Sequence, residues 1–450
     1  MATLGNVTYG LAGSNPAGNN FELQKLDAAK YISLYDLVNK PDNRDALIKT
    51  YGNQGITGFL QLVGATKAVA TNDEVQYWEE ERLHKKQAGS MAAITAGDAT
   101  VVLTAASAAA VIVRLQDVVL VNGSERGLVT GISSAAITLT ALSSDGFSAA
   151  SLNASASVPV IGNLYSQGSD QPSEFIESGI TKRVNPFMIM KEVYSVTGSQ
   201  ATNIGWINLG NGDYRWYVKG EQDTRQRFID KREMMLLLGQ KVGNTSNVAA
   251  ATYGGGSEGY FAAIEDRGMV HSGLVNTVAE LDIIVKEFDK QGAGSEYALY
   301  VNRDQDLAID DMLATGIGTL SSNGVSGQFG AFNNSADMAI KLGFKSFTRG
   351  GYTFHKHDWK LLNDPTLLGD SDFKGVAIPM STVVDPQSGD RNPSLEINYK
   401  NSNGYSREME HWMTGSFMGA TNDTKDVAQF NYRSELALVT RAANRHMLIK

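Results

Sequence analysis

The sequence predicts an α+β fold that carries a separate all-β module. Short runs of β-branched residues alternate with turn signals between residues 88 and 169, which is typical of a small barrel or sandwich. Helical patterns are expected at about 221–238 and 274–290, and most of the chain after them has the pattern of strands. With 46 Gly and 9 Pro, the chain also has the composition of a turn-rich protein. Its 450 residues are more than one hydrophobic core usually supports, so we expect two or three domains.

The composition excludes several classes of protein. The chain has no cysteine, which excludes a disulfide scaffold, a cysteine-ligated metal site and thiol catalysis. Its net charge of −9 argues against a basic surface that wraps nucleic acid. The first 20 residues lack the basic start and apolar block of a signal peptide. The most apolar stretch, 99–113, has only 15 residues and three hydroxyl side chains, so we expect a soluble protein without a membrane partner.

The region 88–170 is predicted to be a self-contained β-rich module. Only six of the 82 residues from 88 to 169 are charged, about a third of the chain's average. Apolar runs lie at 101–103, 118–121, 128–129 and 137–140. The dipeptides Asn122-Gly123 and Asp145-Gly146 are turn signals between or after such runs.

Two other parts of the chain have few apolar residues that they could bury by themselves. Residues 1–54 form a polar, Gly- and Asn-rich arm that holds one helix-like piece. Residues 171–217 are predicted to be a long β-arm, with one limb at 180–194 and a returning limb at 214–217. Between the limbs lies a polar, flexible tip, formed by Thr197, Gly198, Ser199, Gln200, Ala201, Thr202 and Asn203. Because a two-stranded arm is marginally stable in water, we expect it to lie on a neighbouring subunit.

A charged helix is predicted directly after this arm. Glu221 and Asp223 are expected in its first turn, and Gly239 is expected to end it, which suits the helix dipole and a C-terminal cap. Four basic residues lie on the helix: Arg225, Arg227, Lys231 and Arg232. They could contact phosphate, but pairing with acidic residues of the same helix or of a neighbouring subunit is the favoured interpretation.

The second half of the chain mixes helices and strands. The helix at 274–290 is followed by a strand at 297–301, a helix at 303–314 with Asn302 as N-cap, and a Gly/Ser loop at 316–330. Residues 395–399 are expected to pair with 407–413 as a hairpin, and 434–439 resembles one more strand.

Two motifs could carry chemistry, and neither is supported by its surroundings. Residues 255–259 match G-x-S-x-G, which would make Ser257 a hydrolase nucleophile, but a weak strand precedes them and no oxyanion motif is present. His355 and His357 would share one face of a strand, as a metal pair does, but no third ligand is recognisable. No phosphate-binding loop is present. We therefore expect no enzyme activity and no cofactor. The extended segments indicate a protein that self-assembles, because only burial between subunits would offset their ordering entropy.

The order of these segments resembles the major capsid proteins of tailed bacteriophages, which have the Hong Kong 97-type fold. The resemblance covers most of residues 55–450. It rests on the segment 75–81 (VQYWEEE), the β-rich insertion, the segment 182–187 (KRVNPF) entering the arm, the helix ending at 232–239 (REMMLLLG), and the late segments 393–399 (PSLEINY) and 413–419 (MTGSFMG).

The resemblance implies a domain plan. It assigns an N-terminal arm to 1–54, the start of the peripheral domain to 55–87, the β-rich insertion to 88–170, and the arm called the E-loop to 171–217. The spine helix and peripheral domain would occupy 218–273, a mainly axial domain 274–380, and late peripheral and axial strands 381–450.

The resemblance also implies an activity and partners. Copies of the chain would form pentamers and hexamers of an icosahedral head around double-stranded DNA, without sequence-specific binding. The limbs at 182–216 would lie over a neighbour's spine helix. Separate scaffolding, portal and decoration proteins are the other expected partners, and the location is the virion, after assembly in the host cytoplasm. Two alternatives are an encapsulin-type compartment, which shares the fold, and a serine hydrolase using Ser257.

Overall fold

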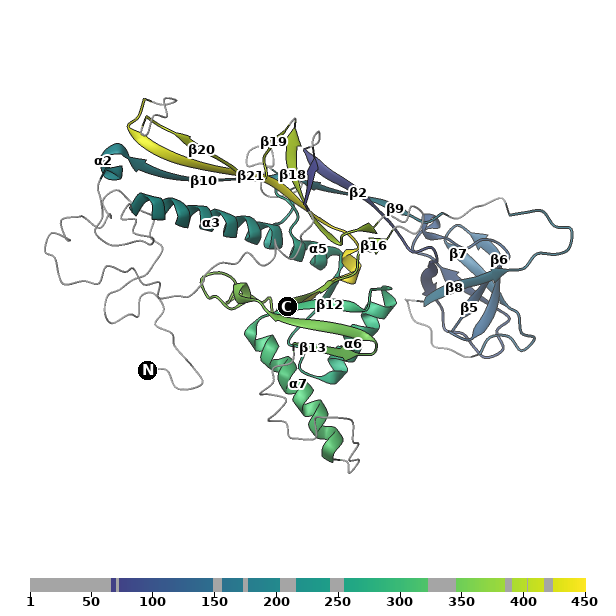
Figure 1. Ribbon diagram of the computed structural model, residues 1–450. Coiled ribbons are helices and arrows are strands. Elements are labelled where there is room, and N and C mark those ends of the chain that lie inside the picture. The colour runs from purple at the N-terminus through teal and green to yellow at the C-terminus, as the bar shows by residue number, and fades with distance from the viewer. Residues whose placement is uncertain are drawn as a thin grey trace. The chain divides into compact units, whose positions relative to one another are not determined.

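The computed structural model describes residues 66–69, 73–148, 156–172, 177–202, 216–242, 255–322, 345–384, 391–402, 404–416 and 424–450. Its described residues fall into two units (Figure 1). Unit 1 holds Ile189–Met235 and Gly404–Glu435, and unit 2 holds Ala65–Met188, Leu236–Asn403 and Leu436–Lys450. The predicted arm at 1–54 lies outside the described residues.

Within unit 2, six strands close into a small barrel, as the sequence predicts for this region. The order around the barrel is β3-β4-β7-β6-β5-β8, and every neighbouring pair is antiparallel. The bounds are Lys86–Met91 for β3, Thr100–Thr104 for β4, Asp117–Val121 for β5, Glu125–Ser133 for β6, Ala136–Ala141 for β7 and Ala156–Asn163 for β8. A short 3₁₀ helix, η3, spans Ala108–Ala110.

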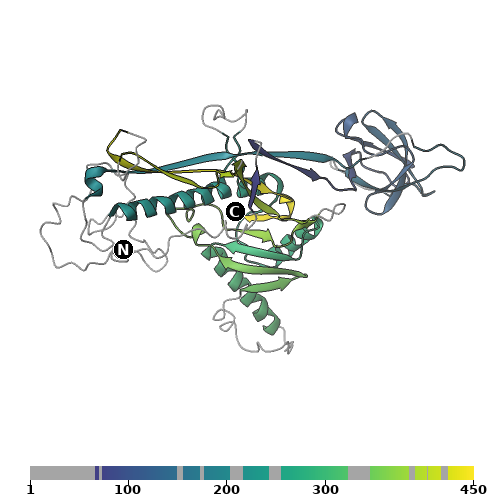
Figure 2. The same ribbon diagram turned by 45° about the horizontal axis from the view of Figure 1, so that its top comes forward.

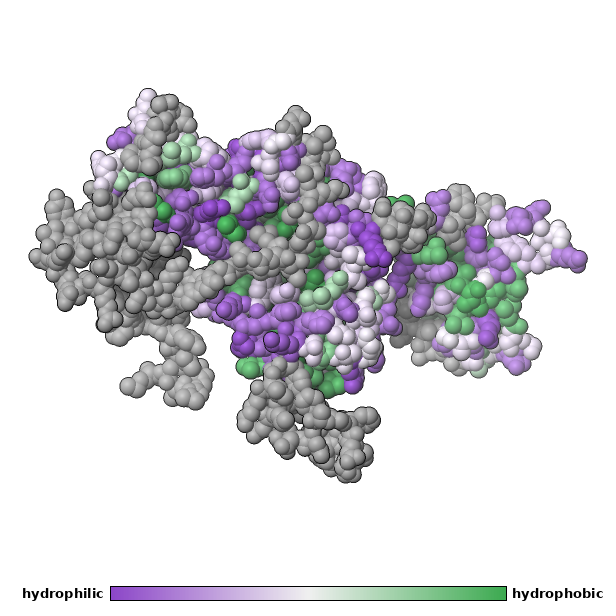
Figure 3. All heavy atoms as spheres, viewed as in Figure 1, coloured by the Kyte–Doolittle hydropathy of each residue, from purple (hydrophilic) through white to green (hydrophobic). Residues whose placement is uncertain are grey.

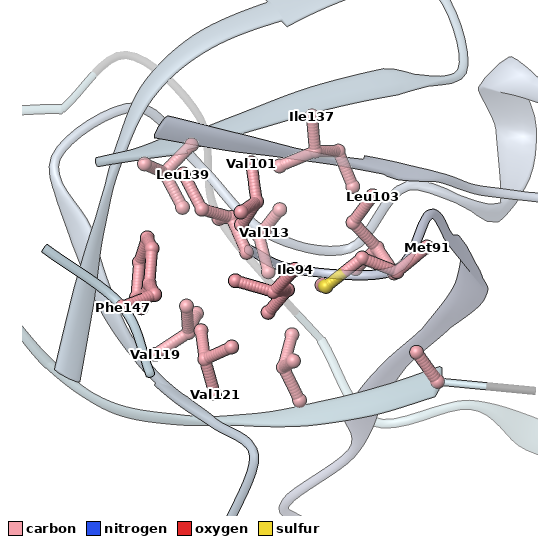
Figure 4. Packing of buried hydrophobic residues seen from close by; sticks show 13 residues of the cluster. Met91, Ile94, Val101, Leu103, Val113, Val119, Val121, Ile137, Leu139 and Phe147 are labelled. Atoms are coloured by element: carbon pink, nitrogen blue, oxygen red, sulfur yellow. The ribbon is translucent and has the colours of Figure 1, made fainter. Parts of the chain in front are cut away.

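The barrel has a hydrophobic core of its own. Leu103 on β4 and Ile137 and Leu139 on the neighbouring strand β7 are fully buried and project into the interior of the barrel (Figure 4). Alternate residues of each strand face inward, which is why short β-branched runs suffice to fill so small a barrel. Asn122 and Gly123 have φ of 57° and 75°, as a type I′ hairpin turn between β5 and β6 requires.

In sequence, the barrel is inserted between the two strands of an antiparallel ribbon. Strand β2, Glu74–Glu80, pairs with β9, Ile180–Pro186, from Glu74↔Pro186 to Glu80↔Ile180. The predicted pairing of this limb with a returning limb at 214–217 is therefore wrong. Asp73, directly before β2, and Tyr77 and Glu79 on β2 each bond to late residues of unit 2. These contacts hold β2 beside β9.

A buried asparagine anchors the end of the ribbon to the rest of unit 2. The amide of Asn185 donates to the carbonyls of Leu438 at 2.6 Å and Glu258 at 3.1 Å, and it accepts from the Glu258 N–H at 2.7 Å. Asn185 thus joins three segments of unit 2 that are far apart in sequence.

Excising the barrel should leave the rest of the chain soluble. Glu80 lies opposite Ile180, and the Glu81 N–H donates to the Gly179 carbonyl at 2.9 Å, so residues 82–178 can be replaced by an Asn-Gly turn. The buried core of the barrel contains only residues from Met91 to Val158, so the deletion opens no cavity elsewhere. Soluble expression and an unchanged limited-proteolysis pattern outside the deletion are expected. Insoluble product would show that the barrel shares a core with the rest.

The remainder of unit 2 is built around a second six-stranded sheet, ordered β11-β22-β15-β12-β14-β13. Helix α6, Val278–Lys290, begins at a capping box formed by Thr277 and Glu280, four residues later than predicted. Helix α7, Arg303–Ser322, is capped by Asn302, as predicted, but it continues through the first part of the predicted loop at 316–330. Stacked rings of Phe288 and Tyr297 lie at the centre of this core. The other bounds are Met269–His271 for β11, Glu296–Val301 for β12, Ser346–Arg349 for β13, Tyr352–Asp358 for β14, Gly375–Pro379 for β15, Met447–Ile449 for β22, Tyr260–Arg267 for α5, Lys360–Leu362 for η4 and Ala443–Arg445 for η6.

Residues 395–399 do not pair with 407–413 as predicted, although the strand that holds 395–399 does pair with the short strand Tyr405–Ser406. Strand β18, Leu395–Ser402, pairs with the Leu436–Thr440 part of β21, which spans Val427–Thr440. Strand β20, Glu410–Thr414, pairs with the earlier part of β21, from Glu410↔Arg433 to Thr414↔Gln429. The 14-residue β21 offers both segments a longer apolar partner than they offer each other. The remaining short strands are Thr66–Val69 for β1, Val383–Val384 for β16, Arg391–Asn392 for β17 and Tyr405–Ser406 for β19.

Candidate assembly surface

Unit 1 is a thin layer of sheet over one long helix. Strand β10, Met188–Thr197, and the first part of β21 lie along helix α3, Trp216–Leu238, in both views (Figures 1 and 2). The core between them is small. Val196, Ala201, Tyr217 and Ala428 form one buried cluster there, and Phe228 and Tyr432 are also buried between the helix and the sheet.

A glycine within α3 lets the helix approach β10 closely. A Cβ at Gly220 would lie 2.5 Å from the Tyr194 hydroxyl oxygen, closer than any such contact allows. Glycine inside a helix costs about 1 kcal/mol relative to alanine. Gly220 leaves room for the Tyr194 ring at this point.

The middle of α3 is held to β21 by aromatic packing and one hydrogen bond. Phe228 is fully buried, and its ring centre lies 6.0 Å from that of Tyr432. The Tyr432 hydroxyl donates to the Glu221 carboxylate. Burial and the adjacent Glu221 charge both raise the pKa of Tyr432, so its hydroxyl stays a donor.

The four predicted basic residues have different surroundings. Arg225 and Arg227 are exposed, and Arg227 donates to the Asp223 carbonyl and the Thr224 hydroxyl. Lys231 forms an ion pair with Glu192 on β10 rather than with an acid of its own helix. Arg232 is buried beside Met409, and burial lowers its pKa, partly opposed by the Glu408 charge.

The helix begins earlier than predicted. It starts at Trp216, so Glu221 and Asp223 lie in its second turn, and two residues of the predicted returning limb, Trp216 and Tyr217, are helical. Tyr217 packs into the core of unit 1, and that burial outweighs the β preference of an aromatic pair. The helix ends at Leu238, before Gly239, as predicted.

The predicted tip is a folded helical turn in its described part. Thr197 caps helix α2, Gly198–Ala201, by accepting from the Gln200 N–H at 3.4 Å, and the Thr202 hydroxyl donates to the Ser199 carbonyl at 2.8 Å. The Gly198 N–H donates to the Asp426 carbonyl at 3.2 Å, where a side chain on residue 198 would collide with the Asp426 carboxylate. Asn203 lies outside the described residues.

Two exposed apolar residues on the outer face of β10, one on each side of exposed Lys191, were not singled out from the sequence. Met188, Glu192 and Val196 belong to the face that alternates toward the interior, while Ile189 and Val193 point to solvent with exposed fractions of 53% and 49%. A period-two count over 188–197 would have found the stripe, because apolar residues occupy both faces of the strand. We call Ile189 and Val193 the β10 stripe. It can bury itself only against another surface.

Neither chemical motif forms a reactive site. Ser257 is 1% exposed, and its hydroxyl oxygen accepts from the Leu438 N–H at 3.4 Å, so a substrate could not reach it. Ser257 therefore cannot be the nucleophile that the hydrolase alternative requires. His355 and His357 lie on β14 as predicted, and His357 stacks on Tyr300. Across the described residues, no group of three His, Cys, Asp or Glu side chains could hold a metal ion. No described helix is both long and apolar enough to cross a membrane.

Comparison with known proteins gives matches only among solved structures. No family model and no curated protein sequence matches the chain. The chain is similar to the capsid of the cyanophage P-SCSP1u, with 8% identity and a TM-score of 0.39 over 94% of this chain and 96% of that one. It is similar to the capsid of cyanophage A-1(L), with 12% identity and a TM-score of 0.42 over 91% and 96%. The SrpI encapsulin complex of Synechococcus elongatus PCC 7942 matches with 10% identity and a TM-score of 0.32 over 61% and 77%.

Proposed function

We propose that this chain is a major capsid protein whose copies assemble into pentamers and hexamers of an icosahedral phage head enclosing double-stranded DNA. The observation that carries the proposal is the construction of unit 1. A long helix and an extended sheet share a small core, and the sheet carries the exposed β10 stripe on its other face. Such a layer gains stability by covering that face with a neighbouring subunit.

The order of elements supports the same proposal. A strand precedes the barrel, a paired strand follows it, and β10, α2 and α3 come next, which is the segment order on which the family resemblance rests. Because β2 pairs with β9, we assign the candidate E-loop to the ribbon at 74–80 and 180–186, which holds the barrel between its two strands in sequence. This assignment replaces the one to the limbs at 182–216. This ribbon has an exposed Trp78 and Ile180 on one face, as expected of an arm that lies on a neighbour.

The charge of the chain fits a container for DNA. A net charge of −9 disfavours binding of the DNA phosphates over a broad surface, so the DNA could move while it is being packaged. Scaffolding, portal and decoration proteins remain proposed partners. The virion is the proposed location, after assembly in the host cytoplasm.

Charging the β10 stripe should stop assembly without unfolding the chain. Ile189→Asp with Val193→Asp places two carboxylates on the face that would be buried, and an unpaired charge in an interface costs several kcal/mol. The matched control is Ser107→Asp with Ser133→Asp, which adds the same two charges at exposed positions outside the β10 face. Light scattering and negative-stain electron microscopy should show closed shells for the native chain and the control, and small species with a native circular dichroism spectrum for the double variant.

Two outcomes would contradict the proposal. A native chain that stays a monomer at all concentrations, and that forms no shells in infected cells where a scaffolding protein would be present, would exclude a shell protein. Closed shells of the double variant would show that the β10 stripe is not an assembly contact. The DNA content of shells purified from infected cells tests the enclosed molecule, since an encapsulin-type compartment would hold protein cargo and no nuclease-protected DNA.

A further inference from the structure

Strand β10 has a strand partner on one side only. It is the last strand in the order β1-β18-β21-β10, so no strand of the described residues pairs with its second edge. We call this second edge the free edge of β10. A strand of ten residues exposes there a row of backbone N–H and C=O groups, which is a template for pairing with another strand.

The contacts between β10 and β21 show which backbone groups point to the free edge. The Gly198 N–H donates to the Asp426 carbonyl at 3.2 Å, directly beyond the ends of the two strands. The rings of Tyr194 and Phe430 lie side by side, with centres 6.3 Å apart. Both contacts fit one antiparallel register in which the even-numbered residues of β10 bond to β21 and the odd-numbered residues point away from it. The odd-numbered residues before the end of the strand are Ile189, Lys191, Val193 and Ser195.

The preceding strand, β9, has the protection that β10 lacks. The Glu81 N–H donates to the Gly179 carbonyl where the β2–β9 pair ends, so the even-numbered residues of β9 point away from β2. Among these, Pro186 has no N–H, and the Val184 carbonyl accepts from the Lys241 Nζ at 2.6 Å. Both features prevent strand addition. β10 contains no proline, and no side chain of the described residues bonds to its outward backbone groups, so its edge is open to a partner.

The N-terminal arm contains a segment with the pattern of a matching strand. Residues 3–11 read TLGNVTYGL, in which Val7, Tyr9 and Leu11 occupy alternate positions. No charged residue occurs in the first 21 positions, so the segment can pair without burying a charge. Residues 12–65 separate this segment from β1, which is enough chain to reach β10 of the same copy or of a neighbouring copy.

We propose that residues 3–11 add an antiparallel strand to the free edge of β10. In the proposed register Leu11 lies opposite Ile189 and Val7 lies opposite Val193, so apolar side chains form cross-strand pairs on the outer face of the sheet. The segment is as long as the open part of β10, and its backbone supplies the hydrogen bonds that the free edge lacks.

The same register accommodates the one charge on this side of β10. Tyr9 lies opposite Lys191, where the ring covers the aliphatic stem and faces the ammonium group. The added strand would widen the β10 stripe, and apolar atoms are visible on the surface of unit 1 near β10 and β20 (Figure 3). The inference goes beyond the proposed function, because this pairing requires no shell.

The absence of cysteine allows a direct test in the full-length protein. Val7→Cys with Val193→Cys places two thiols on residues that are opposite each other in the proposed register. The Cα atoms of such a hydrogen-bonded pair are roughly 5.5 Å apart, within the range that a disulfide spans. The matched control is Thr8→Cys with Val193→Cys, which moves one thiol to the next residue, whose side chain would point to the other face.

Oxidised protein is analysed by non-reducing electrophoresis and peptide mapping. The Val7→Cys, Val193→Cys variant should form its disulfide on the order of 100-fold faster than the control, because strand pairing raises the effective thiol concentration to millimolar or above. Adding Tyr9→Pro removes an N–H that would point to β10 and should abolish most of this gain. This change lies in the arm, so it leaves the core of unit 1 intact.

The outcomes separate this inference from the proposed function. Equal disulfide formation in the variant and the control, in preparations that form shells, would overturn the pairing and leave the shell proposal standing. Linkage of residue 193 to a different protein would overturn the pairing as well. Fast, proline-sensitive linkage supports it, within one chain or between mixed chains that carry one cysteine each. The same result in a chain that forms no shells would support the pairing and contradict the shell.

Discussion

Replacing Phe228 by alanine should loosen unit 1 more than any surface change. The ring is fully buried between α3 and β21, where it packs against Tyr432, and the small core offers few atoms that could fill the gap. Truncation of a buried phenylalanine costs about 3–5 kcal/mol. Hydrogen exchange of the amides in 217–235 and 427–435 should report a loss of local stability of that size.

A partly exposed residue of the same helix provides the control. Met235 is 38% exposed, so Met235→Ala should cost well under half as much. If the two variants lose equal protection, Phe228 is not the residue that joins the helix to the sheet. Assembly offers a second readout, because a loosened layer should form fewer closed shells at the same protein concentration.

Mild acid should destabilise unit 2 through His446. This side chain is fully buried and bonds through Nδ1 to the Tyr260 hydroxyl at 2.6 Å. Burial lowers the pKa of His446 from 6.5 to about 3, and burial keeps Tyr260 protonated by raising its pKa. Tyr260 is therefore the donor, and the folded state requires a neutral imidazole.

The sign of the pH dependence follows from these two values of the histidine pKa. Between pH 6.5 and about 3 the unfolded chain binds a proton at His446 that the folded chain does not, so stability falls as the pH falls through this window. The loss at pH 5 relative to pH 7 is about 2 kcal/mol. Denaturant midpoints and hydrogen exchange of the amides at 447–449 at the two pH values measure it.

A glutamine variant isolates this histidine from the others. His446→Gln keeps a polar side chain but cannot be protonated, so it should remove the part of the acid loss that His446 contributes. His357→Gln, at an exposed position, should leave the loss unchanged. An acid loss of the same size in His446→Gln and the native chain would show that other groups cause it.

The local patterns of the sequence correctly predicted many elements. The apolar runs and turn dipeptides of the barrel, the end of α3 before Gly239 and the cap at Asn302 all occur where expected. These features depend on residues within a few positions of one another, so a single segment contains the information. The interpretation as an assembly protein came from composition and segment order. It predicted that the tip at 197–203 and the basic residues of α3 contact neighbouring subunits, and these contacts remain predictions.

The pairing of distant segments could not be predicted in the same way. The sequence could not show that β9 pairs with β2 across the whole barrel, or that β21 separates β18 from β20. The exposure of Ile189 and Val193 also depends on which neighbours a strand acquires.

The sequence by itself thus determined the kinds of elements, their order, the β-rich module and the absence of a thiol. Only the tertiary structure decided which strands meet, which faces are covered and that Ser257 is buried. The physical reason is that strand pairing is a competition between segments far apart in the chain, settled by the total burial and hydrogen bonding of the folded unit.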